Sequence, residues 1–93
     1  MDSLQQMEFR IIAATNKLVV GETYYLPNTY ENSGCNVRVL SKSTAYNLSG
    51  WPSSVEVEVL ETFGAGKNNL YFQVGMKRVV NGMNLQPARQ MAA

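Results

Sequence analysis

Valine and glutamate alternate at every position from Val55 to Val59 in the segment VEVEVLE. A helix would scatter these valines around its surface, whereas successive side chains of a strand point to opposite faces of a sheet. The alternation therefore predicts a half-buried strand whose valines face a core. Because such a strand needs neighbours to cover its apolar face, this segment limits the chain to a fold built on a β-sheet.

The segment LYFQVGM, residues 70–76, is expected to pair with this strand as the second arm of a hairpin. The register that matches apolar residues pairs Val59 with Phe72, Val57 with Val74, and Val55 with Met76. Residues 62–69 would then form the connecting loop. Its GAGKNN sequence lacks the Ser or Thr that follows the lysine of a phosphate-binding loop, and a strand follows instead of a helix. We interpret this segment as a turn.

Seven glycines and three prolines divide the rest of the chain into short pieces, as in an all-β domain. CNVRVLS places Cys35, Val37 and Val39 on one face, and we expect Cys35 to be buried there. GETYYLP places Tyr24 and Tyr25 on opposite faces, so one of them should point outward. The predicted organisation is an N-terminal segment (1–16), a small β-domain (17–80) and an extended C-terminal arm (81–93) that is ordered only where something pins it.

The N-terminal segment favours a short helix. Ser3 and Gln6 fit a capping box, and an apolar stripe follows at helical spacing, although EFRII also permits a short strand. The stripe consists of Leu4, Met7, Ile11 and Ala14.

Composition limits the location and chemistry of the protein. A chain of 93 residues is one domain in length, and 45% hydrophobic with 16% charged residues is typical of a globular protein. No apolar run approaches the ~18 residues of a membrane span. A single cysteine favours a reducing compartment, so we expect a cytoplasmic protein, or one within a virion or host cell if it is viral.

The available side chains argue against an enzyme. The chain has no histidine, which removes the commonest general base and metal ligand. We find no set of residues for a catalytic, metal or cofactor site, and predict none. Aromatic side chains in turn-rich segments remain, and tryptophan, tyrosine and arginine are the residues on which interfaces depend. The predicted partner-binding residues are Trp51, Tyr30 and the outward one of Tyr24 and Tyr25, with the basic residues Lys77, Arg78 and Arg89 as secondary contacts.

The order LVVGETYYLP, CNVRVLS and then the VEVEVLE hairpin resembles a small SH3-like barrel over residues 17–80, with Gly21-Glu22 as the turn that precedes an early strand. The resemblance implies a mainly β domain of about five antiparallel strands with binding loops at one rim; a small sandwich is the alternative architecture. The family's acidic loop and paired tryptophans are absent, so binding of proline-rich peptides is not implied.

Three functions remain open. The first is a non-enzymatic macromolecule-binding module, an adaptor or small inhibitor that docks on a larger protein partner. The second is a structural subunit of an assembly, a viral one included, that is held by its terminal arms and forms homo-oligomers or larger complexes. The third is a weak nucleic-acid-binding barrel, suggested by the basic C-terminal third, in which all four charged residues after Glu61 are Lys or Arg.

Overall fold

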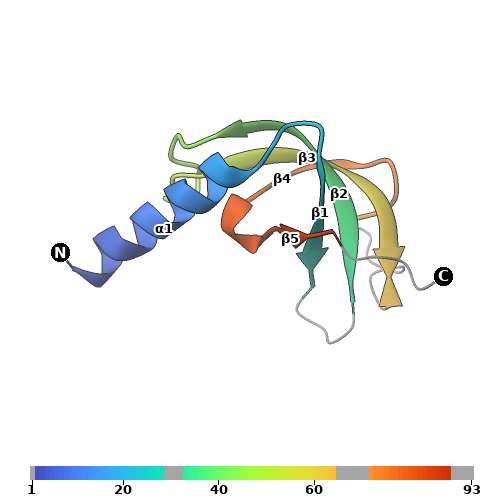
Figure 1. Ribbon diagram of the computed structural model, residues 1–93, viewed down its shortest axis with the longest axis horizontal. Helices are drawn as coiled ribbons and strands as arrows, with labels where there is room; N and C mark the ends of the chain where they lie inside the picture. The colour runs from blue at the N-terminus through green and yellow to red at the C-terminus, as the bar shows by residue number, and fades with distance from the viewer. Residues whose placement is uncertain (1, 29–32, 65–71, 89–93) are drawn as a thin grey trace.

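The computed structural model describes residues 2–28, 33–64 and 72–88 and shows one antiparallel β-sheet preceded by a helix (Figure 1). The strands lie in the order β4-β3-β2-β1-β5. The elements are α1 (Ser3–Lys17), β1 (Thr23–Pro27), β2 (Gly34–Ser43), β3 (Ser54–Phe63), β4 (Lys77–Val80), the 3-10 helix η2 (Gly82–Asn84) and β5 (Gln86–Pro87). The predicted mainly β class with five antiparallel strands is confirmed. Among the described residues no pairing joins β4 to β5, so the sheet is not closed into a barrel.

Side chains form hydrogen bonds with backbone groups at both ends of α1. The Asp2 carboxylate accepts a 2.8 Å hydrogen bond from a backbone N–H of the first turn, so the N-cap is Asp2 and the predicted capping box at Ser3 is wrong by one residue. At the other end, Lys42 Nζ donates to the carbonyl oxygens of Asn16 (2.8 Å) and Leu18 (2.6 Å). A cation at this position complements the negative end of the helix dipole. Lys42 lies in β2, so it ties the end of α1 to the sheet.

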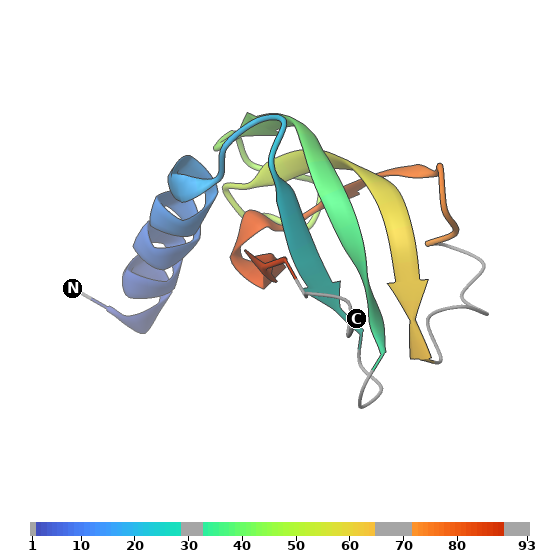
Figure 2. The ribbon, with the colours of Figure 1, turned by 45° about the vertical axis from the view of Figure 1, so that its right-hand side comes forward.

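The first half of α1 extends away from the sheet, as Figures 1 and 2 show. Its buried residues, Ile11 and Thr15, both lie in the second half, whereas Leu4 is 58% exposed. The predicted apolar stripe therefore packs against the rest of the domain only in the second half of the helix.

The core lies on one face of the sheet and is built mainly from valines of the neighbouring strands β2 and β3. Val37, Val39, Val55 and Val57 have no exposed surface, and Val59 is 1% exposed. Each fully buried side chain of this size contributes about 1.5–3 kcal/mol through the hydrophobic effect. Partly buried apolar residues close the core around these valines: Tyr24, Leu26, Phe72, Val80 and Leu85. The predicted inward orientation of Val55, Val57 and Val59 is confirmed.

The predicted pairing of these valines is wrong. Val55 lies opposite Val80, four residues beyond the expected Met76, and Val57 lies opposite Arg78. The cause is a tight turn before β4. Met76 N–H donates to the Gln73 carbonyl (3.0 Å), and Gly75 has a φ of 89°, which favours glycine.

Two further features follow from this turn. Val74 lies in the turn and is 65% exposed, so it does not pair with Val57. A shift by an even number of residues leaves the inward face of β3 unchanged, so its valines stay in the core, while Arg78 and Val80 take the positions opposite Val57 and Val55. Thr62 and Phe63, placed in the loop by the prediction, belong to β3, and residues 65–71 lie outside the described part of the chain.

Residues 81–88, predicted to be part of an extended arm, fold back onto the domain. They form η2 and then β5, which pairs with β1 through Tyr24 with Pro87 and Tyr25 with Gln86. Gly82 is buried against α1, where an added Cβ would lie 2.8 Å from Thr15 Oγ1. The remainder of the predicted arm, residues 89–93, lies outside the described residues.

Candidate functional site: a groove between the β2–β3 loop and β4

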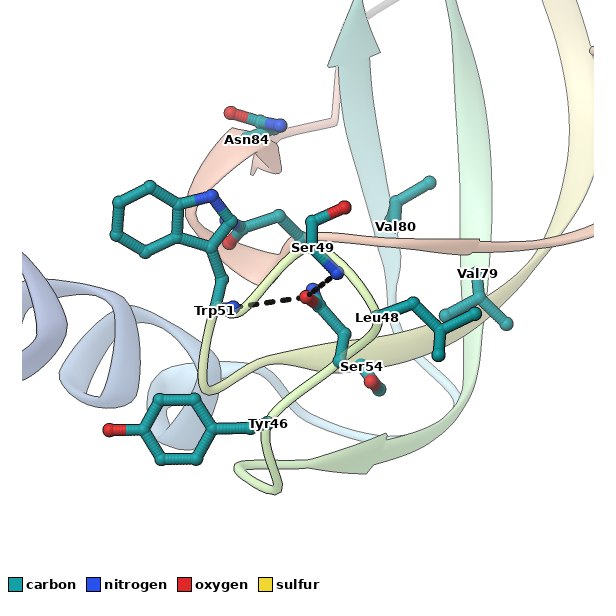
Figure 3. A pocket seen from close by; sticks show the side chains of 10 residues that line it. Tyr46, Leu48, Ser49, Trp51, Ser54, Val79, Val80 and Asn84 are labelled. Atoms are coloured by element: carbon teal, nitrogen blue, oxygen red, sulfur yellow. Dashed lines mark hydrogen bonds between the residues drawn. The ribbon is translucent and has the colours of Figure 1, made fainter.

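A groove of about 740 Å³ lies between the β2–β3 loop (residues 44–53) and the segment formed by β4 and η2 (Figure 3). Two parts of the chain that are about thirty residues apart in sequence form its opposite walls. None of the ten residues lining it carries a formal charge. They are Tyr46, Asn47, Leu48, Ser49, Trp51, Ser54, Val79, Val80, Asn81 and Asn84.

The side chain of Asn47 organises the loop wall. Its Oδ1 accepts hydrogen bonds from the backbone N–H groups of Ser49 (2.9 Å) and Trp51 (3.0 Å), and its Nδ2 donates to the Ser53 carbonyl (2.9 Å). Gly50, with a φ of 83°, supplies the left-handed residue that the turn requires. These bonds fix the backbone on which Trp51 stands, and the dashed lines in Figure 3 mark two of them.

The loop carries large apolar side chains that water reaches. Leu48 is 109% exposed and Tyr46 is 63% exposed, and across the groove Val79 of β4 is 65% exposed. Trp51 is half-buried, and in Figure 3 its indole lies on the side of the groove nearest Asn84. The groove therefore combines an exposed apolar rim with one anchored aromatic ring.

Tyr46 also connects the loop to α1. Its hydroxyl donates a 2.8 Å hydrogen bond to Oε2 of Glu8. This bond to the Glu8 carboxylate raises the pKa of Tyr46 above its ordinary value, because ionisation would remove the donor and place two negative charges side by side.

Polar groups of the groove are amides and hydroxyls. Asn81 Oδ1 accepts a 2.9 Å bond from the backbone N–H of Met83 and so caps η2. Ser49, Ser54 and Asn84 place further uncharged donors and acceptors along the same walls. Such a surface can hydrogen-bond to peptide groups and cover apolar side chains, but it offers no charge to an ionic ligand.

The predicted partner-binding residues do not lie together in one site. Trp51 lines the groove, but Tyr24 lies on the core face of β1, opposite Val37, and its hydroxyl accepts a 2.9 Å bond from Val19 N–H. Tyr25 is therefore the outward tyrosine. Its hydroxyl donates to the Ser33 carbonyl (3.0 Å).

Packing also holds the ring of Tyr25. Its centroid is 6.1 Å from that of Phe63, and the ring lies over Gly34, where an added Cβ would be 2.5 Å from the tyrosine oxygen. Lys77 and Arg78 are the first residues of β4, adjacent in sequence to Val79 of the groove. Tyr30 and Arg89 lie outside the described residues.

Tyr46, Leu48 and Val79 were not predicted as site residues. A usable signal existed for the first two, because an aromatic and a leucine occur among turn-forming residues in the loop that carries Trp51. Val79 carries no such signal, since its exposure depends on the position of β4 at an edge of the sheet.

Cys35 lies in the core and away from the groove. It is 4% exposed, and burial raises the pKa of its thiol from 9.0 to about 11. A thiol with this pKa stays protonated at neutral pH, where it is a poor nucleophile. Within residues 2–28, 33–64 and 72–88, no three side chains of the types that bind metals come together.

Comparisons with known proteins give no relative of this chain: no family model matches, and neither a curated protein nor a solved structure matches significantly. In the described part of the chain, no helix combines the length and apolar character needed to cross a bilayer.

Proposed function

We propose that this protein is a non-enzymatic module, an adaptor or small inhibitor, that docks on a larger protein partner through the groove beside Trp51. The observation that carries the proposal is the gathering of exposed Leu48, Tyr46 and Val79 around this half-buried tryptophan. A cluster of solvent-exposed apolar side chains on the surface of a small protein typically marks an interaction surface. The free, buried Cys35 supports action in a reducing compartment such as the cytoplasm.

The construction of the loop supports a preformed binding site. Asn47 uses both ends of its amide within the loop, so the backbone that carries Trp51 is already ordered before a partner arrives. A preformed site loses less conformational entropy on binding than a flexible one does. Trp51 has the position of an anchor, with Leu48 and Tyr46 as the surrounding contacts that would exclude water.

An SH3-like architecture is part of this proposal. The five antiparallel strands and the position of one groove wall on the β2–β3 loop support it, because binding loops at one rim are what that resemblance implies.

Contacts elsewhere favour this function over the two alternatives. Residues 81–88 fold back onto the domain, with Gln86 and Pro87 paired to β1, instead of extending as an arm. This weakens the case for an assembly subunit held by that segment. On the outer face of the sheet, Arg38 lies 4.0 Å from Glu58, and Lys77 is opposite the same glutamate. This interleaving of acids reduces the positive potential that binding to nucleic acid requires.

The test begins with affinity purification of the partner from the cells that produce this protein, followed by mass spectrometry. Trp51→Ala should then weaken binding of the purified partner by about 2 kcal/mol or more, as measured by calorimetry. The melting temperature of the same variant shows whether the protein remains folded.

Two exposed leucines provide a matched comparison. Leu48→Ala in the groove should weaken binding, whereas Leu4→Ala on the projecting part of α1 should leave the affinity unchanged. Equal affinities for the wild type, Trp51→Ala and Leu48→Ala proteins would contradict the proposed function.

A further inference from the structure

The two edges of the sheet differ in their capacity to accept another strand. β5 contributes two residues, and its Pro87 has no N–H to donate. β4 has four residues and no proline, and among the described residues only β3 pairs with it. Proteins commonly block an exposed edge with proline or a very short strand. The β5 edge has both of these features, and the β4 edge has neither.

The hydrogen-bond pattern identifies the groups that β4 directs outward. Val59 N–H donates to the Met76 carbonyl at 2.9 Å, so this position belongs to the bonded set of the β3–β4 ladder. Bonded and non-bonded pairs alternate along antiparallel strands. Arg78 and Val80 therefore bond to β3, while Lys77 and Val79 direct their N–H and C=O groups away from it. Among the turn, loop and cap hydrogen bonds of the described residues, none involves the backbone of Lys77 or Val79.

The groove continues from this edge. Val79 and Val80 are in its wall, and Leu48 and Trp51 stand across from them (Figure 3). A strand added beside β4 would have its own side chain next to Val79, within reach of the apolar rim on the loop. Backbone bonds along β4 and a side-chain contact in the groove would then act together.

Charge identifies the kind of strand that fits. Lys77 and Val79 lie two residues apart on the same face, and both are exposed. A second copy of β4 that paired about Lys77 or Arg78 would place identical cations opposite each other, which disfavours these registers of self-pairing. An acidic residue beside Lys77 and an apolar residue beside Val79 would complement this edge, and the two would be separated by one residue in an extended peptide.

We propose that the β4 edge binds an extended segment of the protein partner as an additional antiparallel strand, with an acidic side chain at Lys77 and an apolar side chain between Val79 and Leu48. This inference rests on the proposed function, since it names the form of the partner. It adds a main-chain recognition mode to the side-chain contacts of the groove.

The probe is a synthetic library of capped peptides roughly ten residues long, in which Glu and then Leu, Val or Tyr occupy alternate positions among threonines. A matched library carries Lys in place of Glu. Peptides from the Glu library should bind the full-length protein, and those from the Lys library should bind at least about tenfold more weakly.

Two measurements on the best peptide test the main-chain contact. Hydrogen exchange of the Lys77 and Val79 amides should be fast in the free protein and slow in the complex, while the Arg78 and Val80 amides are protected in both. N-methylation of one alternate set of peptide bonds should weaken binding about tenfold or more, and methylation of the other set should have little effect. The second measurement alters only the peptide, so it needs no protein variant.

The inference fails if no peptide of the Glu library binds, if both methylated sets bind alike, or if the Lys77 and Val79 amides gain no protection in a complex. Its failure is separate from that of the proposed function. A purified partner that depends on Leu48 but does not protect these amides would overturn the added strand and leave the groove as the binding site.

Discussion

The β2–β3 loop separates a buried junction, where α1, the end of the loop and η2 meet, from the groove on its other side. In both regions the usual distribution of side chains, apolar inside and polar outside, is reversed. In the junction, the polar residues Thr15 and Ser53 have no exposed surface, and Gly82 is buried beside them. In the groove, Leu48 and Val79 are largely exposed. The difference shows that the loop is fixed from below by polar contacts, which leaves its apolar side chains free to face water.

The junction can contain polar groups because each of them is hydrogen-bonded. Thr15 donates to the Ile11 carbonyl (2.8 Å), so Ser53 donates to Thr15 Oγ1 (2.8 Å) and accepts from Gly82 N–H (2.9 Å). This relay joins α1, the end of the loop and η2. Among the described residues, no buried side-chain nitrogen or oxygen lacks a partner. A junction with unpaired groups would cost several kcal/mol and would not hold the walls of the groove in place.

Breaking the relay should have the largest effect. Ser53→Ala removes the acceptor of Gly82 N–H and a partner of Thr15, and both groups would stay buried. The free energy of unfolding should fall by about 2–4 kcal/mol, measured by urea denaturation. Ser49→Ala, which removes an exposed hydroxyl of the same loop, is the matched control and should change stability by less than about 0.5 kcal/mol. Similar losses for both variants would contradict the role of the relay.

Ionisation of Cys35 provides the next test, because it places a charge inside the core instead of removing a hydrogen bond. Burial raises the pKa of this thiol from 9.0 to about 11, so the unfolded chain loses the proton first as pH increases. The stabilising contribution is complete below pH 9 and is lost as pH rises toward 11. The loss should reach roughly 2 to 3 kcal/mol relative to Cys35→Ala.

Thiol reagents test the same burial near neutral pH. The native protein should react slowly, and the urea-unfolded chain should react fast. Rapid labelling of the native protein, or equal pH dependence of the wild type and Cys35→Ala, would show that the thiol is accessible.

Sequence patterns predicted the features that depend on neighbouring residues. The inward orientation of Val55 and Val57 follows from alternation, which is a local property of any strand. Their partners in β4 could not be obtained in this way. Apolar matching favoured Met76, but the turn from Gln73 to Met76 moves the paired segment by four residues without changing the inward face.

The groove was only partly predictable for a related reason. Trp51 was identified from its loop, but the opposite wall comes from Val79 and Asn84, and their position depends on how β4 and η2 pack. The burial of Thr15 and Ser53 could not be predicted from the sequence, because threonine and serine usually lie on the surface. Here their hydrogen bond to each other satisfies both hydroxyls in the interior.

The loop wall should be less sensitive than the junction beneath it. Asn47→Ala removes three hydrogen bonds that hold residues 49–53, and stability should fall by about 1–2 kcal/mol, since water can replace part of what is lost at this half-buried site. The more informative measurement is affinity for the purified partner, which should weaken although no proposed contact is removed. An unchanged affinity would mean that the loop does not need to be preformed.

The contact between Tyr46 and Glu8 should give the smallest effect, because it lies on the surface. Glu8→Ala removes the carboxylate that raises the pKa of Tyr46, so this pKa should fall toward its ordinary value, which an ultraviolet titration can follow. Because the pKa of the Tyr46 hydroxyl is raised in the folded protein, its contribution to stability is complete at pH values below the pKa of the unfolded chain. That contribution is lost as the pH rises through the pKa of the folded protein. Here water screens the interaction, so the free energy of unfolding at neutral pH should hardly change. A large loss of stability in Glu8→Ala would show that the contact with α1 helps to hold the loop from the solvent side. The buried relay of Thr15 and Ser53 would then not be sufficient to explain how the groove is held.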